Sequence, residues 1–407
     1  MRQDVKVIGL VGGGHFLSHF YILVLPPLFP LLRGELDVSY TALGAALAVL
    51  NVTTALTQAP VGFMVDRYGA PGILVGGLAL FALATALVGV FGTYPALLLL
   101  MVLAGLGNSV FHPADYAILS ASVEPERMGR AFSIHTFGGY FGFAAAPVTI
   151  VFLTGLLGWR AALISSGAVG LAVALLMLAN RGVLRDDRAL RGSRDGAVPT
   201  TRQRTGGDIR LLLSPPILMA LLFFVMLALT QGGAMSFGVS ALEALYRVPL
   251  VEANLPLTAF LFASALGVLA GGWAADRLGH HERIVAICLI VSALTIGAVA
   301  AFVPPLWAVT GLFTLGGFFF GVIAPSRDLM VRAVTPRGAS GKVFGFVTTG
   351  FNIGGVITPL IFGLVLDLGE PRLVFWLIAI LSLATLVTVA ATGRQGRRRG
   401  QAIEAAD

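Results

Sequence analysis

Ionisable side chains gather on two short segments of an otherwise apolar sequence. Asn108, His112 and Asp115 are separated by four and three positions, so they share one face if the segment is a helix. Four positions also separate His15 from His19. Imidazole changes its charge near neutral pH, and a carboxylate can hold a proton or a cation. These residues are therefore our candidates for binding a solute or carrying a proton.

Two other interpretations of the same residues stay open at this point. They could form a buried hydrogen-bonded network that only orders the helices. They are also ligand types that divalent metal ions accept, although the chain has no histidine-rich loop, and we expect no resident metal ion. His135 lies near the end of its own apolar segment, beside glycines, and ranks below the other histidines as a candidate.

The elements that carry these residues are predicted to lie in a membrane. The 407 residues are 57% hydrophobic and 12% charged, which excludes a soluble globule. Apolar segments recur at the length of ~20 residues that a helix needs to cross a bilayer. We predict an all-α integral membrane protein with twelve transmembrane helices, at 5–32, 39–65, 72–92, 95–122, 130–155, 160–181, 213–245, 252–275, 283–303, 305–333, 340–366 and 371–393.

These segments divide into two halves of six. We predict an N-terminal half over 1–181 and a C-terminal half over 213–393, joined by a cytoplasmic linker over 182–212 and followed by a basic tail over 394–407. The linker alternates arginine with aspartate and contains glycine and proline, so it is too polar to form a core.

The basic residues predict the orientation of the chain. If both termini are cytoplasmic, 22 of the 27 lysines and arginines lie inside, and only Arg33, Arg160, Arg247 and Arg372 lie outside. This asymmetry satisfies the positive-inside rule and predicts a multi-pass protein of the cytoplasmic (inner) membrane. The net charge of +7 is thereby explained by topology, and we expect no nucleic-acid partner.

An eight-residue signature occurs twice. It reads Gly-x-x-x-Asp-Arg-x-Gly at 62–69 and again at 272–279, 210 positions later. Further pairs recur at an offset of 212, namely Pro113 with Pro325, Gly129 with Gly341, Phe132 with Phe344, and Pro147 with Pro359. Because six helices per repeat is an even number, the two copies insert in the same orientation, related by an axis along the membrane normal. We expect a cavity between the halves.

The repeated signature, in loops between the correct spans, resembles that of the major facilitator superfamily along essentially the whole chain. Ala70-Pro71 and His280-His281 depart from it, since further basic residues are usual there. The resemblance implies that the first, fourth, seventh and tenth helices line the cavity, which suits both clusters of candidates. It also adds Gln231 on the seventh helix, at the repeat offset from His19.

The resemblance further implies a cytoplasmic latch. Asp66 would face the start of the eleventh helix, and Asp276 would face the start of the fifth, near Arg130. The residues assigned to this latch are Gly62, Asp66, Arg67, Gly69, Arg130, Gly272, Asp276, Arg277 and Gly279. The alternative is a signature that only anchors the topology.

The tenth helix breaks the repeat. Arg327, followed by Asp328, stands at the offset-212 position of Asp115. One hypothesis is that Asp115 and Arg327 approach when the cytoplasmic side closes. Two alternatives are a pair between Arg327 and Asp328 within one half, and an Arg327 that binds an anionic group of the substrate.

Together these features predict a secondary active transporter that works by alternating access. The region around His15 and His19, and the run Phe111-His112-Pro113, look somewhat like the fosmidomycin-resistance type of efflux carriers. We therefore expect proton-coupled efflux of a small organic compound, with an anionic compound as one option. Uptake of a small anion by symport, divalent-metal transport and a transporter-like receptor that does not cycle are the alternatives. We expect a monomer with no catalytic site and no cofactor.

Overall fold

The protein is helical throughout the part that its structure, a computed structural model, describes: residues 2–124, 127–185, 210–336 and 340–404. The helices of the N-terminal part are α1 (Arg2–Ile22), η1 (Pro26–Leu28), α2 (Phe29–Leu36), α3 (Tyr40–Tyr68), α4 (Ala70–Phe91), α5 (Tyr94–Asn108), α6 (Phe111–Ser122), α7 (Met128–Leu157) and α8 (Trp159–Ala179). They are followed by α11 (Pro215–Tyr246), α12 (Leu250–Leu278), α13 (His281–Phe302), α14 (Leu306–Val334), α15 (Ser340–Asp367) and α16 (Pro371–Glu404).

Twelve helical stretches of the described residues are long and apolar enough to cross a membrane, from Val5–Leu36 to Pro371–Ala391. Backbone N–H and C=O groups in lipid must be satisfied within the chain, which a helix achieves by itself. The predicted all-α membrane fold with twelve spans is confirmed.

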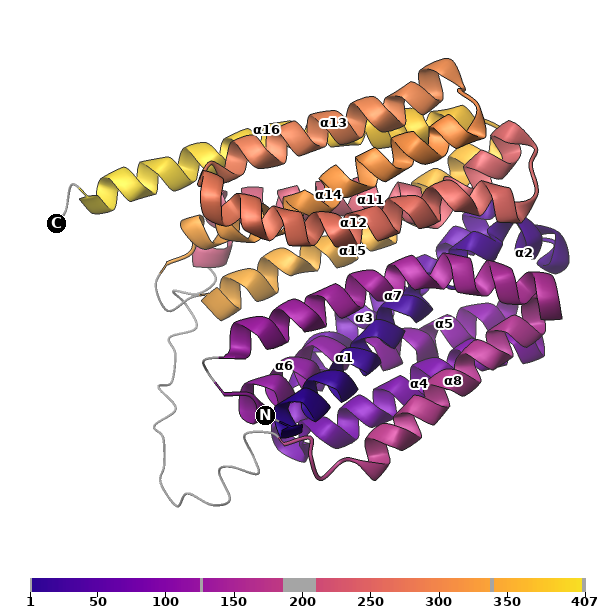
Figure 1. Ribbon diagram of the computed structural model, residues 1–407, viewed down its shortest axis with the longest axis horizontal. Coiled ribbons are helices and arrows are strands. Elements are labelled where there is room, and N and C mark those ends of the chain that lie inside the picture. Colours follow the sequence, from indigo (N-terminus) through magenta and orange to yellow (C-terminus); the bar gives the residue numbers. More distant parts are fainter. Residues whose placement is uncertain (1, 125–126, 186–209, 337–339, 405–407) are drawn as a thin grey trace. The chain divides into compact units, whose positions relative to one another are not determined.

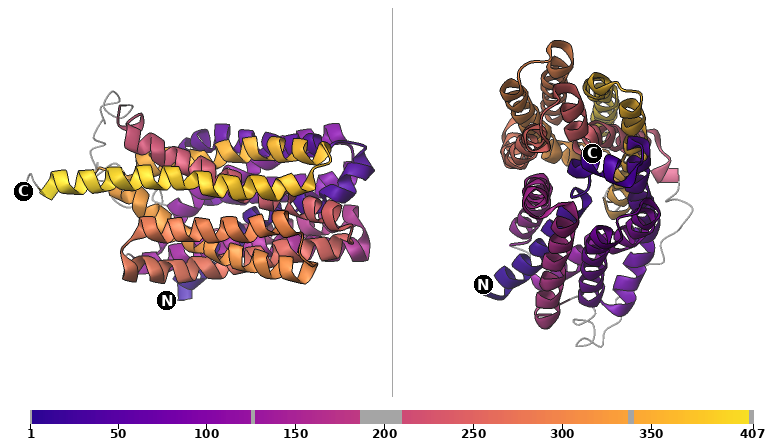
Figure 2. Two further views of the ribbon diagram at one scale, coloured as in Figure 1. Left: turned by 90° about the horizontal axis from the view of Figure 1, so that it is seen from above. Right: turned by 90° about the vertical axis from the view of Figure 1, so that its right-hand side faces the viewer.

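The described residues fall into two compact units. The first comprises the described residues up to 185 with Pro249–Asn254, and the second comprises the described residues of 210–248 and 255–404. Inside the first unit α1 packs on α7 and α4 on α8, and inside the second α11 packs on α15 and α16. The helices of each unit run side by side along a common direction (Figures 1 and 2). Residues 186–209 of the predicted linker and the side chains of the predicted tail lie outside the described residues.

Two of the predicted continuous helices are interrupted. The first span passes from α1 through η1 to α2, where the consecutive Pro26 and Pro27 cannot donate backbone hydrogen bonds. The fourth span divides into α5 and α6 at residues 109–110. Pro113 has no N–H to donate to the carbonyl of Ser109, which accounts for a break at this place. Asn108 therefore ends one helix, while His112 and Asp115 belong to the next.

The duplication is visible in a packing contact that both units make. The hydroxyl of Thr54 on α3 donates to the carbonyl of Gly105 on α5 at 3.2 Å. The hydroxyl of Ser264 on α12 donates to the carbonyl of Gly317 on α14 at 2.8 Å. These pairs are related by the same offsets of 210 and 212 that the sequence shows. At both glycines a Cβ atom would collide with backbone of the facing helix, so the repeat includes a glycine that permits close helix contact.

Candidate functional site

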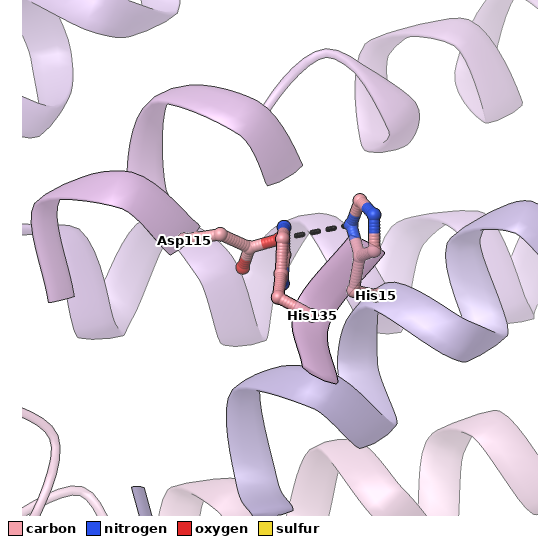
Figure 3. A group of neighbouring side chains, drawn as sticks. All are labelled: His15, Asp115 and His135. Atoms are coloured by element: carbon pink, nitrogen blue, oxygen red, sulfur yellow. Dashed lines mark ion pairs between the residues drawn. The ribbon is translucent and has the colours of Figure 1, made fainter. Parts of the chain in front are cut away.

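Three helices of the first unit bring one carboxylate and two imidazoles together (Figure 3). His15 of α1 places Nδ1 3.1 Å from Oδ2 of Asp115 on α6, and His135 of α7 places Nε2 3.7 Å from the same oxygen. The rings of His15 and His135 stack with their centroids 3.7 Å apart. Asp115 is fully buried, and His15 and His135 are 3% and 2% exposed. We call these residues, with His19 and His112, the histidine cluster.

His19 and His112 extend the cluster in two directions from His15. Their ring centroids lie 4.5 Å and 5.5 Å from that of His15. The rings of His19 and Phe143 make a T-shaped contact with their centroids 4.3 Å apart, and His112 stacks on Tyr116. His112 is exposed, whereas Asp115 is completely covered, so the cluster reaches from the surface of the structure to a buried carboxylate.

Glycines on α7 position the cluster. A Cβ at Gly138 would lie 3.5 Å from the carbonyl of Gly12 on α1, and a Cβ at Gly139 would lie 2.9 Å from Nε2 of His15 and 3.1 Å from Cε1 of His19. The two imidazoles of α1 therefore lie in the space that a side chain at position 139 would need. The absence of side chains at these glycines permits close contact between α1 and α7.

His135, which ranks below the other histidines in the sequence, lies beside Asp115 and His15 in the structure. It precedes Gly139 by four residues, one helical turn, so both lie on the face of α7 that packs on α1. The spacing of four residues could have indicated this position. A histidine one helical turn from a glycine that contacts a second helix lies on the face that makes this contact. The sequence alone does not show that α7 is the partner of α1.

The polar atoms of the cluster are poorly satisfied. Both oxygens of Asp115, both ring nitrogens of His135, and Nδ1 of His15 and of His19 are buried without a hydrogen-bond partner among the described residues. The distance of 3.1 Å between His15 and Asp115 suits a hydrogen bond, but the two groups are not aligned for one. Buried polar groups are normally hydrogen-bonded, so this arrangement is costly to the fold. It is suited to holding a proton, a cation or a donor group of a solute.

Asn108 and Gln231 take other places. The amide of Asn108 donates to the hydroxyl of Thr54 at 3.3 Å, which ties α5 to α3 rather than to the histidines. Gln231 is half-buried on α11 in the second unit. The role of both residues in substrate binding stays a prediction.

Arg327 makes the pair within one half that the sequence left open. Its Nε donates to Oδ1 of Asp328 at 2.8 Å. Its guanidinium also lies over two aromatic rings of the same unit, at 4.8 Å from the centroid of Phe224 and 5.2 Å from that of Phe351. The approach of Asp115 to Arg327 on closure stays a prediction.

The two copies of the loop signature end their helices alike. Gly69 and Gly279 both have positive φ, +97° and +62°, a conformation that glycine adopts without strain. Arg67 lies over the ring of Tyr68, and Arg277 lies over that of Trp273, both at 5.2 Å. Within each unit, no atom of the described residues lies within 4 Å of a Cβ built at Gly62 or Gly272, so neither glycine makes a close helix contact with that part of its unit.

The latch itself stays a prediction. Asp276 is exposed, and the side chains of Asp66 and Arg130 lie outside the described residues.

Comparison with known proteins decides the family. A sequence model of the Major Facilitator Superfamily matches residues 11–251 and 226–405. The chain belongs to the major facilitator superfamily. It is therefore a membrane transporter and not an enzyme. Its similarity to the Fosmidomycin resistance protein of Escherichia coli is 25% identity over 397 residues, 95% of this chain and 93% of that protein.

Other relatives in the superfamily are named for different solutes. The chain is 26% identical over 361 residues to the Multi-drug resistance efflux pump PmrA of Streptococcus pneumoniae, covering 85% of this chain and 86% of the pump. It is 25% identical over 350 residues to a Probable nitrate/nitrite transporter, NarK2, of Mycobacterium tuberculosis, covering 83% and 85%.

Solved structures share the fold. A bacterial homolog of the human lysosomal transporter Spinster, in an inward-facing and occupied conformation, superposes with a TM-score of 0.75 at 15% identity, covering 98% of this chain and 97% of that one. The nucleoside transporter NupG superposes with a TM-score of 0.74 at 15% identity, covering 96% and 99%.

Proposed function

We propose that this superfamily member exports a small organic solute from the cell by alternating access, in exchange for protons, and that the histidine cluster is its coupling site. Direction and solute class are supported by the relatives. Two of those with high coverage are named for resistance to fosmidomycin and for multidrug efflux. The nitrate/nitrite relative marks uptake as the competing direction.

The observation that carries the proposal is the buried carboxylate of Asp115. Ionisable residues inside membrane-spanning helices are costly and are characteristically found where a solute or an ion passes. Asp115 lies within the span Tyr94–Ser122, and its ion-pair partners among the described residues are two histidines rather than an arginine or a lysine. A carboxylate neutralised by a permanent cation would serve the structure alone. One surrounded by imidazoles can take up and release a proton as its exposure changes.

The exposed member of the cluster gives the coupling a route. His112 is exposed and lies three positions before Asp115 on α6. A solute or a proton that reaches His112 is therefore close to the carboxylate. We assign the solute contact to His112 and His19, and the coupling step to Asp115 with His15 and His135.

A susceptibility assay with fosmidomycin tests the direction of transport. Bacterial cells that lack their own exporter would express the wild-type chain, the Asp115→Asn variant or a His280→Gln control, whose histidine is exposed outside the cluster. We expect the wild type and the control to raise the inhibitory concentration severalfold, and Asp115→Asn to return it to that of the empty vector. Greater sensitivity in the presence of the wild-type chain would indicate uptake and contradict export.

Proteoliposomes that enclose a pH-sensitive dye test the coupling. Addition of fosmidomycin should move protons through the wild-type protein, and this movement should be absent from Asp115→Asn at equal protein content. Solute movement without proton movement would refute the exchange, and an Asp115→Asn variant that transports normally would remove the cluster from the mechanism.

A further inference from the structure

We infer that the histidine cluster binds one divalent transition-metal ion of the zinc and cobalt class, with His15, Asp115 and His135 as its ligands. The inference goes beyond the proposed exchange of solute and protons, because it assigns a second kind of ligand to the same carboxylate. It also replaces the expectation, drawn from the sequence, that the chain has no metal site.

The spacing of the ligand atoms is the first argument. One ligand atom from each of His15, Asp115 and His135 can be chosen so that all three lie within 4.8 Å of one another. Bonds of ~2.1 Å at the tetrahedral angle place two ligand atoms of a zinc ion roughly 3.4 Å apart. The distances from Oδ2 of Asp115 to the two imidazoles, 3.1 Å and 3.7 Å, lie on either side of that value. The three side chains are therefore close enough to share one ion after a local rearrangement.

The unsatisfied atoms are the second argument. Nδ1 of His15, Nε2 of His135 and both oxygens of Asp115 are buried and have no hydrogen-bond partner among the described residues. All three side chains are more than nine-tenths buried, and the carboxylate points at both rings (Figure 3). A cation between them would be bound at once by one ligand atom from each of these three side chains.

The donor set selects the class of ion. Two imidazoles and one carboxylate suit Zn²⁺, Co²⁺ and related transition metals, whereas Mg²⁺ and Ca²⁺ prefer oxygen ligands throughout. His19 and His112, whose rings lie 4.5 Å and 5.5 Å from that of His15, are available for a fourth position. Because His112 is exposed, it also gives the ion a way in.

Binding requires one local rearrangement. A metal ion lies in the plane of each imidazole that ligates it, but the rings of His15 and His135 are stacked at 28° with their centroids 3.7 Å apart. One of the two rings must turn about its terminal side-chain bond, which is a soft torsion. Gly139 leaves no room for a larger residue beside His15, so we expect His135 to be the ring that turns.

Metal binding by the purified full-length protein tests the inference. The protein would be prepared in detergent without a histidine tag, treated with a chelator, dialysed and titrated with Co²⁺. We expect visible d–d absorption that saturates at one ion per chain and is displaced by Zn²⁺. His135→Gln should weaken Co²⁺ binding at least tenfold, and the matched His280→Gln control should bind as the wild type does.

A second variant guards against loss of folding. His135→Cys keeps a ligand at the position and should retain Co²⁺ while adding a sulfur charge-transfer band, which a merely structural role of His135 would not produce. Absence of saturable Co²⁺ absorption from wild-type protein, or equal binding by His135→Gln and the wild type, would overturn the inference. The cobalt titration measures binding and does not depend on transport, so a failure to bind Co²⁺ would leave the proposed exchange of solute and protons intact. A protein that binds Co²⁺ but does not exchange solute for protons would refute only the proposed exchange.

Discussion

At the scale of single residues, Asp115 is costly to the fold. Its carboxylate is fully buried among membrane helices, and neither oxygen has a hydrogen-bond partner among the described residues. A buried polar group left unsatisfied costs roughly 1–3 kcal/mol. Residues retained at such a cost are characteristic of sites where stability is given up for function.

The substitution Asp115→Asn separates the effect of this carboxylate on stability from its effect on transport. We expect it to abolish proton-coupled export while leaving the melting temperature unchanged or raising it by a few degrees, because the amide supplies a donor that the carboxylate lacks. Thermal unfolding of the detergent-purified protein measures the change. Asp328→Asn is the control. The carboxylate of Asp328 already accepts a hydrogen bond from Arg327 at 2.8 Å, so an amide at this position should not raise the melting temperature. A marked fall in the melting temperature of Asp115→Asn would identify Asp115 as a structural residue.

Four of the five members of the histidine cluster could be named from the sequence, for a physical reason. His15 and His19, and likewise His112 and Asp115, are separated by one helical turn on apolar segments, and ionisable groups inside spans stand out by their cost. His135 did not stand out in the same way, because its importance depends on which helices touch. That α1 packs on α7 is a tertiary fact that spacing within one helix does not contain.

At the scale of elements, the contact between α1 and α7 controls the geometry of the cluster. Gly139→Ala would place a Cβ 2.9 Å from Nε2 of His15, a distance that requires the imidazole or the helix to move. Gly138→Ala would place a Cβ 3.5 Å from the carbonyl of Gly12, which is ordinary contact. Overpacking of this kind costs about 1–3 kcal/mol.

We therefore expect Gly139→Ala to weaken both export and Co²⁺ binding, and its neighbour Gly138→Ala to keep both near the wild-type level. Fosmidomycin susceptibility and cobalt titration measure the two effects on the same pair of variants. Equal behaviour of the pair would show that the space beside His15 does not control the site.

The helices themselves were predictable, and the places where they break were not. Length and apolar composition mark the spans, because lipid imposes both requirements along the whole segment. The interruption at residues 109–110 depends on Pro113 four residues later. A proline in a membrane helix is often accommodated without a break, as Pro325 at the repeat-related position within the continuous α14 shows. The sequence therefore marks where a break is permitted, and packing decides whether it occurs.

At the scale of the whole molecule, the charge asymmetry and the repeat can be recognised in the sequence because both patterns extend along the full chain. The 27 basic residues are distributed so that placing both termini in the cytoplasm leaves only four of them outside. The hydroxyl-to-carbonyl contacts at Gly105 and Gly317 show the repeat in three dimensions. What a sequence does not provide is the arrangement of side chains around a solute, because this depends on packing between helices that are remote in the chain.

The orientation can be tested with single cysteines. Cys288 is buried and is the only cysteine of the chain, so a Cys288→Ser background is free of reactive thiols. Glu35 and Glu370 are exposed in connections predicted to lie outside, and Glu124 and His280 are exposed in connections predicted to lie inside. Each would be replaced by cysteine in turn and treated with a membrane-impermeant maleimide.

Intact cells should label Glu35→Cys and Glu370→Cys, and only permeabilised cells should label Glu124→Cys and His280→Cys. The reason is that basic residues near the ends of short loops resist transfer across the membrane, and this holds the loops that contain them in the cytoplasm. The reverse pattern would place both termini outside the cell. It would contradict the predicted orientation, and the face of the carrier that is expected in the cytoplasm would then lie outside. Labelling of all four positions in intact cells would contradict a single orientation altogether.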